Sequence, residues 1–200
     1  IIGILIKYGF QDILSDAGFS LKARLVETFL PSDMVENIHK YSKWERMRMA
    51  TEELGTTYIK LAQILSNRPD VIPQNLVIEF EKLQTKVPPF PGTVARSIIE
   101  NELGKTIGEV FEYFADEPFA SASIAQVHKA RLKSGDIVVL KVRRPDILEK
   151  IELDIIIMKY FAHQMEERGY FVNLDPVGIV RAFDNAIHKE LDLSHEGYNL

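Results

Sequence analysis

A single lysine, Lys141, interrupts a run of apolar residues that extends from Ile137 to Val142. An ammonium group is costly to bury unless an anion lies beside it, so a buried Lys141 requires a carboxylate or a phosphate within reach. The competing interpretation places Lys141 on an edge or on the solvent-facing side of its strand, without a ligand. The residue types in this stretch favour neither interpretation over the other.

A run of small residues, which we call the small-residue loop (residues 120–125), precedes this lysine in the sequence. It comprises Ala120, Ser121, Ala122, Ser123, Ile124 and Ala125. Small residues let backbone amides approach phosphates closely, and a lysine on a following strand neutralises the phosphate charge. The two features together predict a cradle for nucleotide phosphates. The loop alone is weak evidence, because it contains no glycine and small residues before a strand are common.

The elements that would position these groups are two strands joined by a turn. The stretches on either side of Lys133–Asp136 contain apolar and β-branched residues, and Lys-Ser-Gly-Asp is typical of a turn. This pattern predicts a β-hairpin whose first strand follows the small-residue loop and whose second strand carries Lys141.

A second polar group lies on a predicted helix from Trp44 to Asn67. Lys60 and Gln63 are three residues apart and Asn67 is seven from Lys60, so the three fall on one stripe of this helix. An apolar stripe lies on another side. A surface helix of any function has this pattern, and spacing alone favours that interpretation.

The last predicted helix offers two competing chemistries. Asp175 followed by Pro176 predicts its start, because aspartate is favoured as N-cap and proline in the first turn. Four residues on one face have the types of metal ligands in a helical bundle: His188, Asp192, His195 and Glu196. An ion pair of Glu196 with Lys141, which would orient the lysine toward phosphates, is the favoured interpretation.

The remaining apolar periodicity predicts further helices. Two lie within residues 1–30 and are broken at Gly18, one begins at Ser32 or Asp33, and three span residues 74–85, 93–103 and 146–168. The amphipathic residues 1–30 fit a membrane surface or, as the favoured interpretation, packing onto the rest of the protein. The proline-rich stretch from Lys86 to Gly92 is the clearest linker, and we place a domain boundary there.

Composition excludes several classes of protein. The 200 residues are 46% hydrophobic and 26% charged, which is ordinary for a globular chain able to bury a core. Cysteine is absent, so disulfides, cysteine ligands and cysteine nucleophiles are excluded. A formal net charge of -5 gives no basic surface for nucleic acid. No apolar run approaches the length of a membrane-spanning helix.

Three separated blocks share the motifs of one family. They are Glu53-Leu-Gly55 followed by Lys60-Leu-Ala-Gln63, Ser66 and Arg68-Pro-Asp70; Pro118–Leu132 followed by Val138–Pro145; and Glu190-Leu-Asp192 with Glu196 and Asn199. In order, they resemble the KxGQ block, the alanine-rich loop with its lysine strand, and the ExD motif with the helix-C glutamate of the ABC1/UbiB/ADCK family of atypical protein-kinase-like proteins. Ala62 departs from the family's glycine.

This resemblance implies an α+β fold. Residues 1–87 would form an N-terminal helical extension that contains the KxGQ-like block. Residues 88–200 would form a protein-kinase-like small lobe, a short antiparallel sheet plus helices. The chain begins without methionine and ends within a predicted helix, so we expect a part of a longer protein. A second lobe would hold the catalytic-loop and metal-binding aspartates, and without it the chain would be inert.

The resemblance also implies roles for individual residues. Lys141 would contact the α- and β-phosphates, Glu196 would orient it, and the small-residue loop would cover the nucleotide. Lys60 and Gln63 would gate the site and occlude the place where a peptide substrate binds in ordinary kinases.

Glu190 and Asp192 would interact with the KxGQ-like block and restrain the handling of nucleotide and substrate. Two residues apart, they point to different sides of an ideal helix, so they would not form one bidentate pair unless the helix is distorted. Solvated charges on a helix surface are the competing interpretation for this pair.

The activity implied is that of an atypical kinase or ATPase that binds ATP or ADP with Mg²⁺ and acts on a small molecule rather than on proteins. It would support ubiquinone or related isoprenoid-quinone biosynthesis, in the cytoplasm and peripheral to the inner face of the membrane. Further candidate partners are a lipid or quinone precursor, the membrane surface and a second copy of the chain. The alternative is a non-catalytic, pseudokinase-like regulatory or lipid-binding module, which would bind lipid vesicles and no nucleotide.

Overall fold

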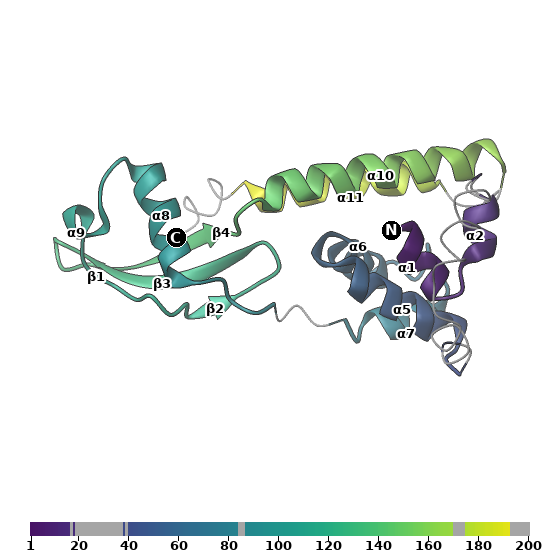
Figure 1. The fold of residues 1–200 in the computed structure, drawn as a ribbon, viewed down its shortest axis with the longest axis horizontal. Helices are drawn as coiled ribbons and strands as arrows, with labels where there is room; N and C mark the ends of the chain where they lie inside the picture. Colours follow the sequence, from purple (N-terminus) through teal and green to yellow (C-terminus); the bar gives the residue numbers. More distant parts are fainter. Residues whose placement is uncertain (17, 19–37, 39, 84–86, 170–174, 193–200) are drawn as a thin grey trace. The chain divides into compact units, whose positions relative to one another are not determined.

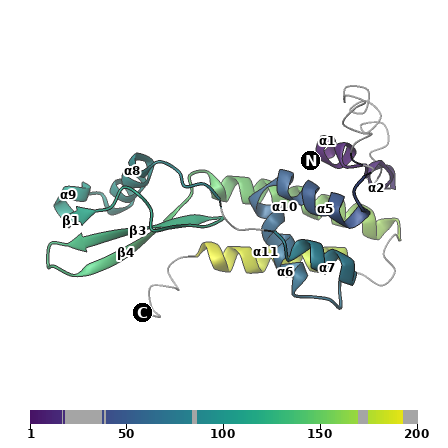
Figure 2. The same ribbon diagram turned by 90° about the horizontal axis from the view of Figure 1, so that it is seen from below.

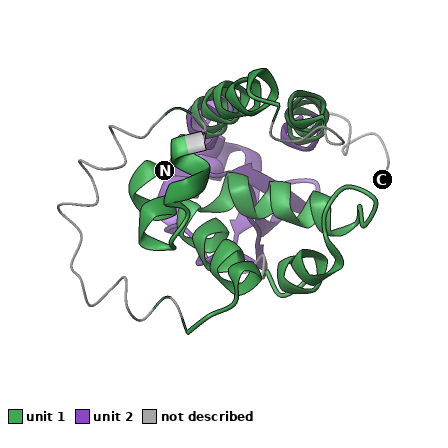
Figure 3. Cartoon of the chain, turned by 90° about the vertical axis from the view of Figure 1, so that its right-hand side faces the viewer, with its two compact units in different colours: residues 1–84, 151–188 green, residues 85–150, 189–200 purple. Residues whose placement is uncertain are grey.

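The computed structural model describes residues 1–16, 18, 38, 40–83, 87–169 and 175–192. They form two compact units, distinguished by colour in Figure 3, and the chain as a whole combines helix and sheet. Unit 1 comprises Ile1–Gln84 and Ile151–His188, and unit 2 comprises Thr85–Lys150 and Lys189–Leu200. The expected α+β class is confirmed. The domain boundary predicted between residues 87 and 88 stays a prediction, because compactness does not establish which segments fold on their own.

Unit 1 is helical throughout its described residues (Figure 1). Its helices are α1 (Ile2–Lys7), α2 (Gln11–Asp16), α5 (Lys43–Leu54), α6 (Thr56–Ser66), α7 (Gln74–Phe80), most of α10 (Ile147–Glu167) and most of α11 (Pro176–Leu191). One buried cluster joins α6 to the α7 region through Ala62, Leu76, Phe80 and Leu83. The helix predicted from Ser32 or Asp33 lies outside the described residues.

The expectation of one helix from Trp44 to Asn67 is wrong, because Gly55 divides it into α5 and α6. Gly55 has φ 97° and ψ -165°, a backbone conformation that is essentially restricted to glycine. Helix α5 starts with a capping box, in which Ser42 Oγ accepts from the Glu45 amide and the Glu45 carboxylate accepts from the Ser42 amide. Apolar periodicity continues through Gly55, and it therefore conceals the break.

The described residues of unit 2 contain a four-stranded antiparallel sheet, the helices α8 and α9, and the short parts of α10 and α11 that do not belong to unit 1. The elements that lie wholly in unit 2 are α8 (Gly92–Leu103), α9 (Ile107–Val110), β1 (Phe111–Phe114), β2 (Ala120–Ser121), β3 (Ala125–Leu132) and β4 (Ile137–Arg143). Strand β4 pairs along β3, whereas β1 and β2 pair with the two ends of β3 along its other edge. The predicted hairpin is confirmed, and its turn is closed by a bond from the Leu132 amide to Asp136 O at 2.9 Å.

One face of this sheet is covered and forms the core of unit 2. Helices α8 and α9 lie on that face (Figure 2), where Ile99 and Ile107 pack against Ala130 and Val142. Because side chains alternate along a strand, the even-numbered residues of β3 and β4 face this core. The odd-numbered residues, including Lys141, therefore face the opposite side of the sheet.

The start of α11 is confirmed but its predicted extent is wrong. The Gly178 amide donates to Asp175 Oδ1 at 2.6 Å, as expected of an N-cap. The helix ends at Leu191, so Asp192 follows it rather than belonging to it. Aspartate is a poor helix former and is disfavoured near the negative end of the helix dipole, which accounts for this end. His195, Glu196 and Asn199 lie outside the described residues.

Candidate functional site

The small-residue loop is a tight connection between β2 and β3. The Ala122 amide donates to Ala125 O at 2.9 Å and closes the turn. The side chains of Ser123, Ile124 and Ala125 are buried, whereas Ala120 and Ala122 are exposed. The loop therefore presents backbone and two methyl groups to its surroundings, and this small bulk permits close approach of a ligand.

Lys141 lies on the sheet face opposite the core. It is directly across from Val127 of β3, and Val139 on the same face is 54% exposed. Lys141 itself is half-buried. A cationic group beside exposed apolar side chains suits a ligand that combines a flat apolar base with anionic phosphates.

The KxGQ-like residues belong to unit 1. Gln63 Nε2 donates to Leu83 O at 3.4 Å, a long bond toward the chain that follows α7. Ala62 is only 2% exposed and packs against Leu76 and Phe80, so the methyl group that replaces the family's glycine is buried against α7. Lys60 is half-buried on the same helix. The gating of the unit 2 loop by Lys60 and Gln63 stays a prediction.

The acidic residues of the third block are described only in part. Glu190 is half-buried in the last turn of α11, and Asp192 is exposed just beyond it. Glu196 lies outside the described residues, so its ion pair with Lys141 stays a prediction. The roles suggested for Glu190 and Asp192 likewise stay predictions.

His188 contacts acidic residues of two helices, and its bond to Glu152 joins α11 to α10. Its Nε2 lies 2.7 Å from Glu152 Oε1 and its Nδ1 lies 2.8 Å from Asp184 O, so both ring nitrogens face acceptors. The bond to the Asp184 carbonyl and the bond to Glu152 raise the pKa of His188 above its ordinary value. Lys159 Nζ also contacts Asp184, at 2.6 Å. Across the described ranges, no three His, Asp or Glu residues are grouped so as to hold a metal ion.

Sequence reasoning missed a buried polar network beside the loop. Gln126 exchanges two hydrogen bonds with the backbone of Phe90, accepting from N at 3.0 Å and donating to O at 3.1 Å. His128 Nδ1 lies 2.8 Å from Ala115 O, and its Nε2 lies 2.9 Å from Gln126 Nε2. Because the carbonyl needs a donor, Nδ1 carries the proton and Nε2 accepts. The alternation of side chains along the strand could have indicated this network, because Gln126 and His128 both fall on the core face of β3.

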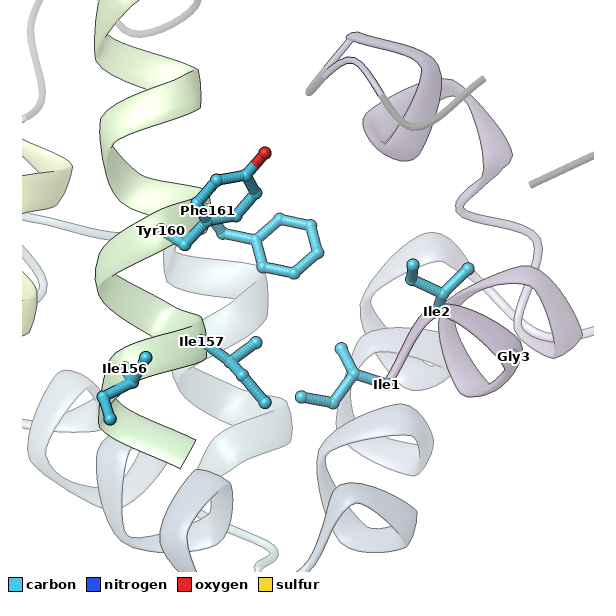
Figure 4. Close-up of a pocket in the computed structure, with 7 residues that line it drawn as sticks. All are labelled: Ile1, Ile2, Gly3, Ile156, Ile157, Tyr160 and Phe161. Carbon is cyan, nitrogen blue, oxygen red and sulfur yellow. The ribbon is translucent and has the colours of Figure 1, made fainter. Parts of the chain in front are cut away.

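An apolar pocket lies in unit 1, between the start of the chain and α10 (Figure 4). Its volume is about 620 Å³. It is lined by Ile1, Ile2, Gly3, Ile156, Ile157, Tyr160 and Phe161. This size and lining suit a small apolar ligand. Separately, every helix within the described ranges is too short or too polar to cross a bilayer.

Comparison with known proteins gives a consistent result. Residues 82–200 match the family model of the ABC1 atypical kinase-like domain. Three similar curated proteins are each named Probable protein kinase UbiB. The protein of Marinobacter nauticus is 44% identical over 161 residues, which cover 80% of this chain and 29% of the relative.

The two other relatives match nearly the whole chain. The protein of Xylella fastidiosa is 39% identical over 197 residues, covering 98% of this chain and 36% of the relative. The protein of Sodalis glossinidius is 38% identical over 203 residues, covering 100% of this chain and 37% of the relative. The chain thus spans about a third of the length of these curated relatives.

Proposed function

The chain belongs to the ABC1 family of atypical kinase-like proteins, and we propose that it contributes the nucleotide-binding small lobe of a UbiB-type atypical kinase or ATPase. Its ligand is ATP or ADP with Mg²⁺. The activity supports ubiquinone or related isoprenoid-quinone biosynthesis, which the name of the relatives suggests. The single observation that carries this proposal is the position of Lys141. It lies on the outward face of β4, and β4 pairs with β3, the strand that begins where the small-residue loop ends.

The geometry of unit 2 supports separate roles for its residues in nucleotide binding. Lys141 pairs with the phosphates, and the small-residue loop lies over them. The exposed Val139 and the half-buried Val127 share the face of Lys141 and provide an apolar surface for the base. A lysine that neutralises phosphate charge and a loop of small residues are the parts that phosphoryl-transfer sites use to position the nucleotide.

Mg²⁺ supplies neutralisation of the β- and γ-phosphate charge in such sites. The described residues offer no group of three His, Asp or Glu residues for it, so no metal ligand is assigned among them. Glu196 orients Lys141, Lys60 and Gln63 gate the site, and Glu190 with Asp192 restrains nucleotide and substrate. The roles of these five residues rest on the match of their motifs to the family.

The phosphoryl acceptor in this proposal is a small molecule, and the protein works in the cytoplasm at the inner face of the membrane. A lipid or quinone precursor at the membrane surface is the substrate class in this proposal. A second copy of the chain is a further candidate partner.

Titration of the full-length protein with MgATP and MgADP tests the proposal. Lys141→Met should weaken nucleotide binding about tenfold or more, because a charged contact to phosphate is lost. Lys133→Met is the matched control: it removes the same charge from the exposed turn of the same hairpin and should leave the affinity unchanged. Equal affinities of the wild type and Lys141→Met would refute the assigned site.

The apolar pocket of unit 1 favours a second candidate function, a non-catalytic lipid-binding module. In that case Ile156→Asp, which places a charge in the pocket wall, would abolish binding to lipid vesicles. The wild type would then bind vesicles and show no heat of nucleotide binding. Nucleotide binding that depends on Lys141 would reject this alternative as the main function.

A further inference from the structure

Arg144 is the residue immediately after β4, three positions beyond Lys141. Its guanidinium makes several hydrogen bonds, and they lead to two segments far apart in the sequence. One is the small-residue loop, and the other is residues 87–90, which we call the linker segment. Both segments belong to unit 2. Arg144 therefore connects the strand that bears Lys141 with the loop proposed to lie over the phosphates.

The bonds to the small-residue loop involve three of its residues. Arg144 Nε donates to Ala122 O at 3.0 Å, and Nη2 donates to Ser121 Oγ at 2.8 Å. The Arg144 backbone amide donates to Ile124 O at 2.9 Å. A planar guanidinium with donors in a fixed fork is suited to hold several acceptors at set positions. The turn of the loop is thus fixed from one side by a single residue.

The bonds to the linker segment come from the same nitrogen. Arg144 Nη2 donates to Pro88 O at 3.0 Å and reaches Val87 O at 3.4 Å. Ser121 Oγ donates to Val87 O at 2.9 Å, which ties loop and linker segment together directly. The guanidinium carbon also lies 5.7 Å from the centre of the Phe90 ring, within the range of a cation–π contact.

The linker segment is itself held to the sheet independently of Arg144. Gln126, which is fully buried in β3, exchanges both of its amide bonds with the Phe90 backbone. The linker segment is therefore fixed in place, and the hydrogen bonds of Arg144 anchor the small-residue loop to it.

The positive charge of Arg144 is compensated in an unusual way, by neutral hydrogen-bond acceptors. Among the residues that the structure describes, its bonds go to carbonyl oxygens and a hydroxyl, and no carboxylate pairs with it. Burial accordingly lowers its pKa, although a guanidinium keeps its proton in proteins. A partly buried cation with these acceptors contributes little Coulomb attraction of its own, so its effect is mainly to fix geometry.

We propose that Arg144 is a positioning residue for nucleotide binding, which holds the small-residue loop against the linker segment in the conformation that receives the phosphates. This inference rests on the proposed function, because it names a further residue of the same site. A loop ordered before binding costs less to fix when the ligand arrives, so removal of Arg144 weakens binding without removing a contact to the nucleotide.

The first test needs no nucleotide. Amide hydrogen exchange in the full-length protein is compared between the wild type, Arg144→Lys and the control Arg131→Gln. Arg144→Lys keeps a charge but its single ammonium cannot span both segments, so exchange in residues 120–125 should rise about tenfold, whereas the Phe90 amide, which is bonded to Gln126, should stay protected. Arg131→Gln alters an exposed arginine near the hairpin turn and should change neither segment. Unchanged exchange in Arg144→Lys would overturn the inference.

The second test measures MgATP affinity in the same variants. Arg144→Lys should bind MgATP about tenfold to a hundredfold more weakly than the wild type. Arg131→Gln should bind it with the same affinity as the wild type. Arg144→Ala should regain affinity with millimolar methylguanidinium and not with methylammonium, a difference that a general loss of stability would not produce. Ser121→Ala, which removes one acceptor, gives a smaller loss in the same direction and remains informative if Arg144→Ala does not fold.

The two tests separate the inference from the function on which it rests. A wild type that binds no nucleotide refutes the proposed function, while the exchange measurement still decides whether Arg144 orders the loop. Faster loop exchange with wild-type MgATP affinity in Arg144→Lys overturns the positioning role. If Arg144→Lys keeps its full MgATP affinity and Arg144→Ala loses it, the charge of residue 144 alone supports binding. That result would also overturn the positioning role.

Discussion

Thr57 Oγ1 donates a 2.6 Å hydrogen bond to Asp154 Oδ2, which joins α6 to α10 within unit 1. Thr57 is only 1% exposed, so water has little access to replace the bond. Helix α6 also carries Lys60 and Gln63. The bond between Thr57 and Asp154 therefore fixes how the helix with the KxGQ-like residues packs in its unit.

Thr57→Val should destabilise unit 1, because the shape is kept while Asp154 loses its donor. We expect the free energy of unfolding to fall by about 1–3 kcal/mol. Urea denaturation of the 200-residue chain, followed by the fluorescence of Trp44, its one tryptophan, measures this in unit 1. Thr57→Ser is the control: it keeps the donor, loses one methyl group and should cost less. Equal stability of Thr57→Val and the wild type would show that the bond contributes nothing.

Ala62→Gly restores the family's glycine and should nevertheless lower stability. The change loses about 1 kcal/mol of helix propensity and about 0.8 kcal/mol from the buried methyl group, or about 2 kcal/mol together. Ala186→Gly is the matched control, since Ala186 is an exposed alanine in α11 and carries only the propensity term. Equal losses in the two variants, by the same urea measurement, would mean that the Ala62 methyl group contributes no packing.

The stability contributed by His188 should depend on pH. Its pKa is raised in the folded state, so its contribution is fully present below the unfolded value of about 6.5 and is lost as pH rises through the raised folded value. His188 is 44% exposed, and screening by solvent limits the effect to about 1 kcal/mol or less. Glu152 and Asp184 are the charged groups in contact with His188, and Lys159 pairs with Asp184.

His188→Gln compared with the wild type measures this contribution. The difference in the free energy of unfolding should be largest near pH 5–6 and should shrink above the raised pKa. His163→Gln is the control, because His163 lies 4.0 Å from Glu166 on the exposed side of α10. A difference that grows with rising pH would contradict the sign of the raised pKa.

The hairpin was predictable from the sequence because its signals are local: the turn at 133–136 and the alternation around Lys141 lie within a few residues of one another. Gly55 and Asp192 ended helices within segments whose periodicity continued, so those breaks were missed. The bonds of Gln126 to Phe90 join residues 36 positions apart. Such contacts depend on tertiary packing, and the spacing of residues in a single sequence does not predict them.

The polar groups around Arg144 were missed for the same reason. Its acceptors Val87 and Pro88 lie 57 and 56 positions away in the sequence, and only the folded sheet brings them together. Lys141 and the small-residue loop, in contrast, were proposed from their residue types and their match to the family's motif, and their role in a nucleotide site stays a prediction. The sequence thus suggested the candidate site but not the residues that hold its loop in place.

Gly92 at the start of α8 lies against the connection between β1 and β2. A Cβ atom at Gly92 would be 2.3 Å from Asp116 O and 2.9 Å from Asp116 C, and backbone atoms cannot rotate away as a side chain can. The pair of Arg96 with Asp116 also holds α8 to this connection. Gly92→Ala should therefore force α8 away from the sheet and cost about 1–3 kcal/mol.

Gly108→Ala is the matched control for Gly92→Ala. Gly108 lies in helix α9 of the same unit, and a Cβ there would meet nothing within 4 Å. Because alanine reduces the freedom of the unfolded chain, this variant should gain about 0.4–1 kcal/mol. Hydrogen exchange of the β3 amides reports the stability of unit 2 in both variants. Slower or unchanged exchange in Gly92→Ala would show that α8 accommodates the methyl group, and would contradict the close approach of Gly92 to Asp116.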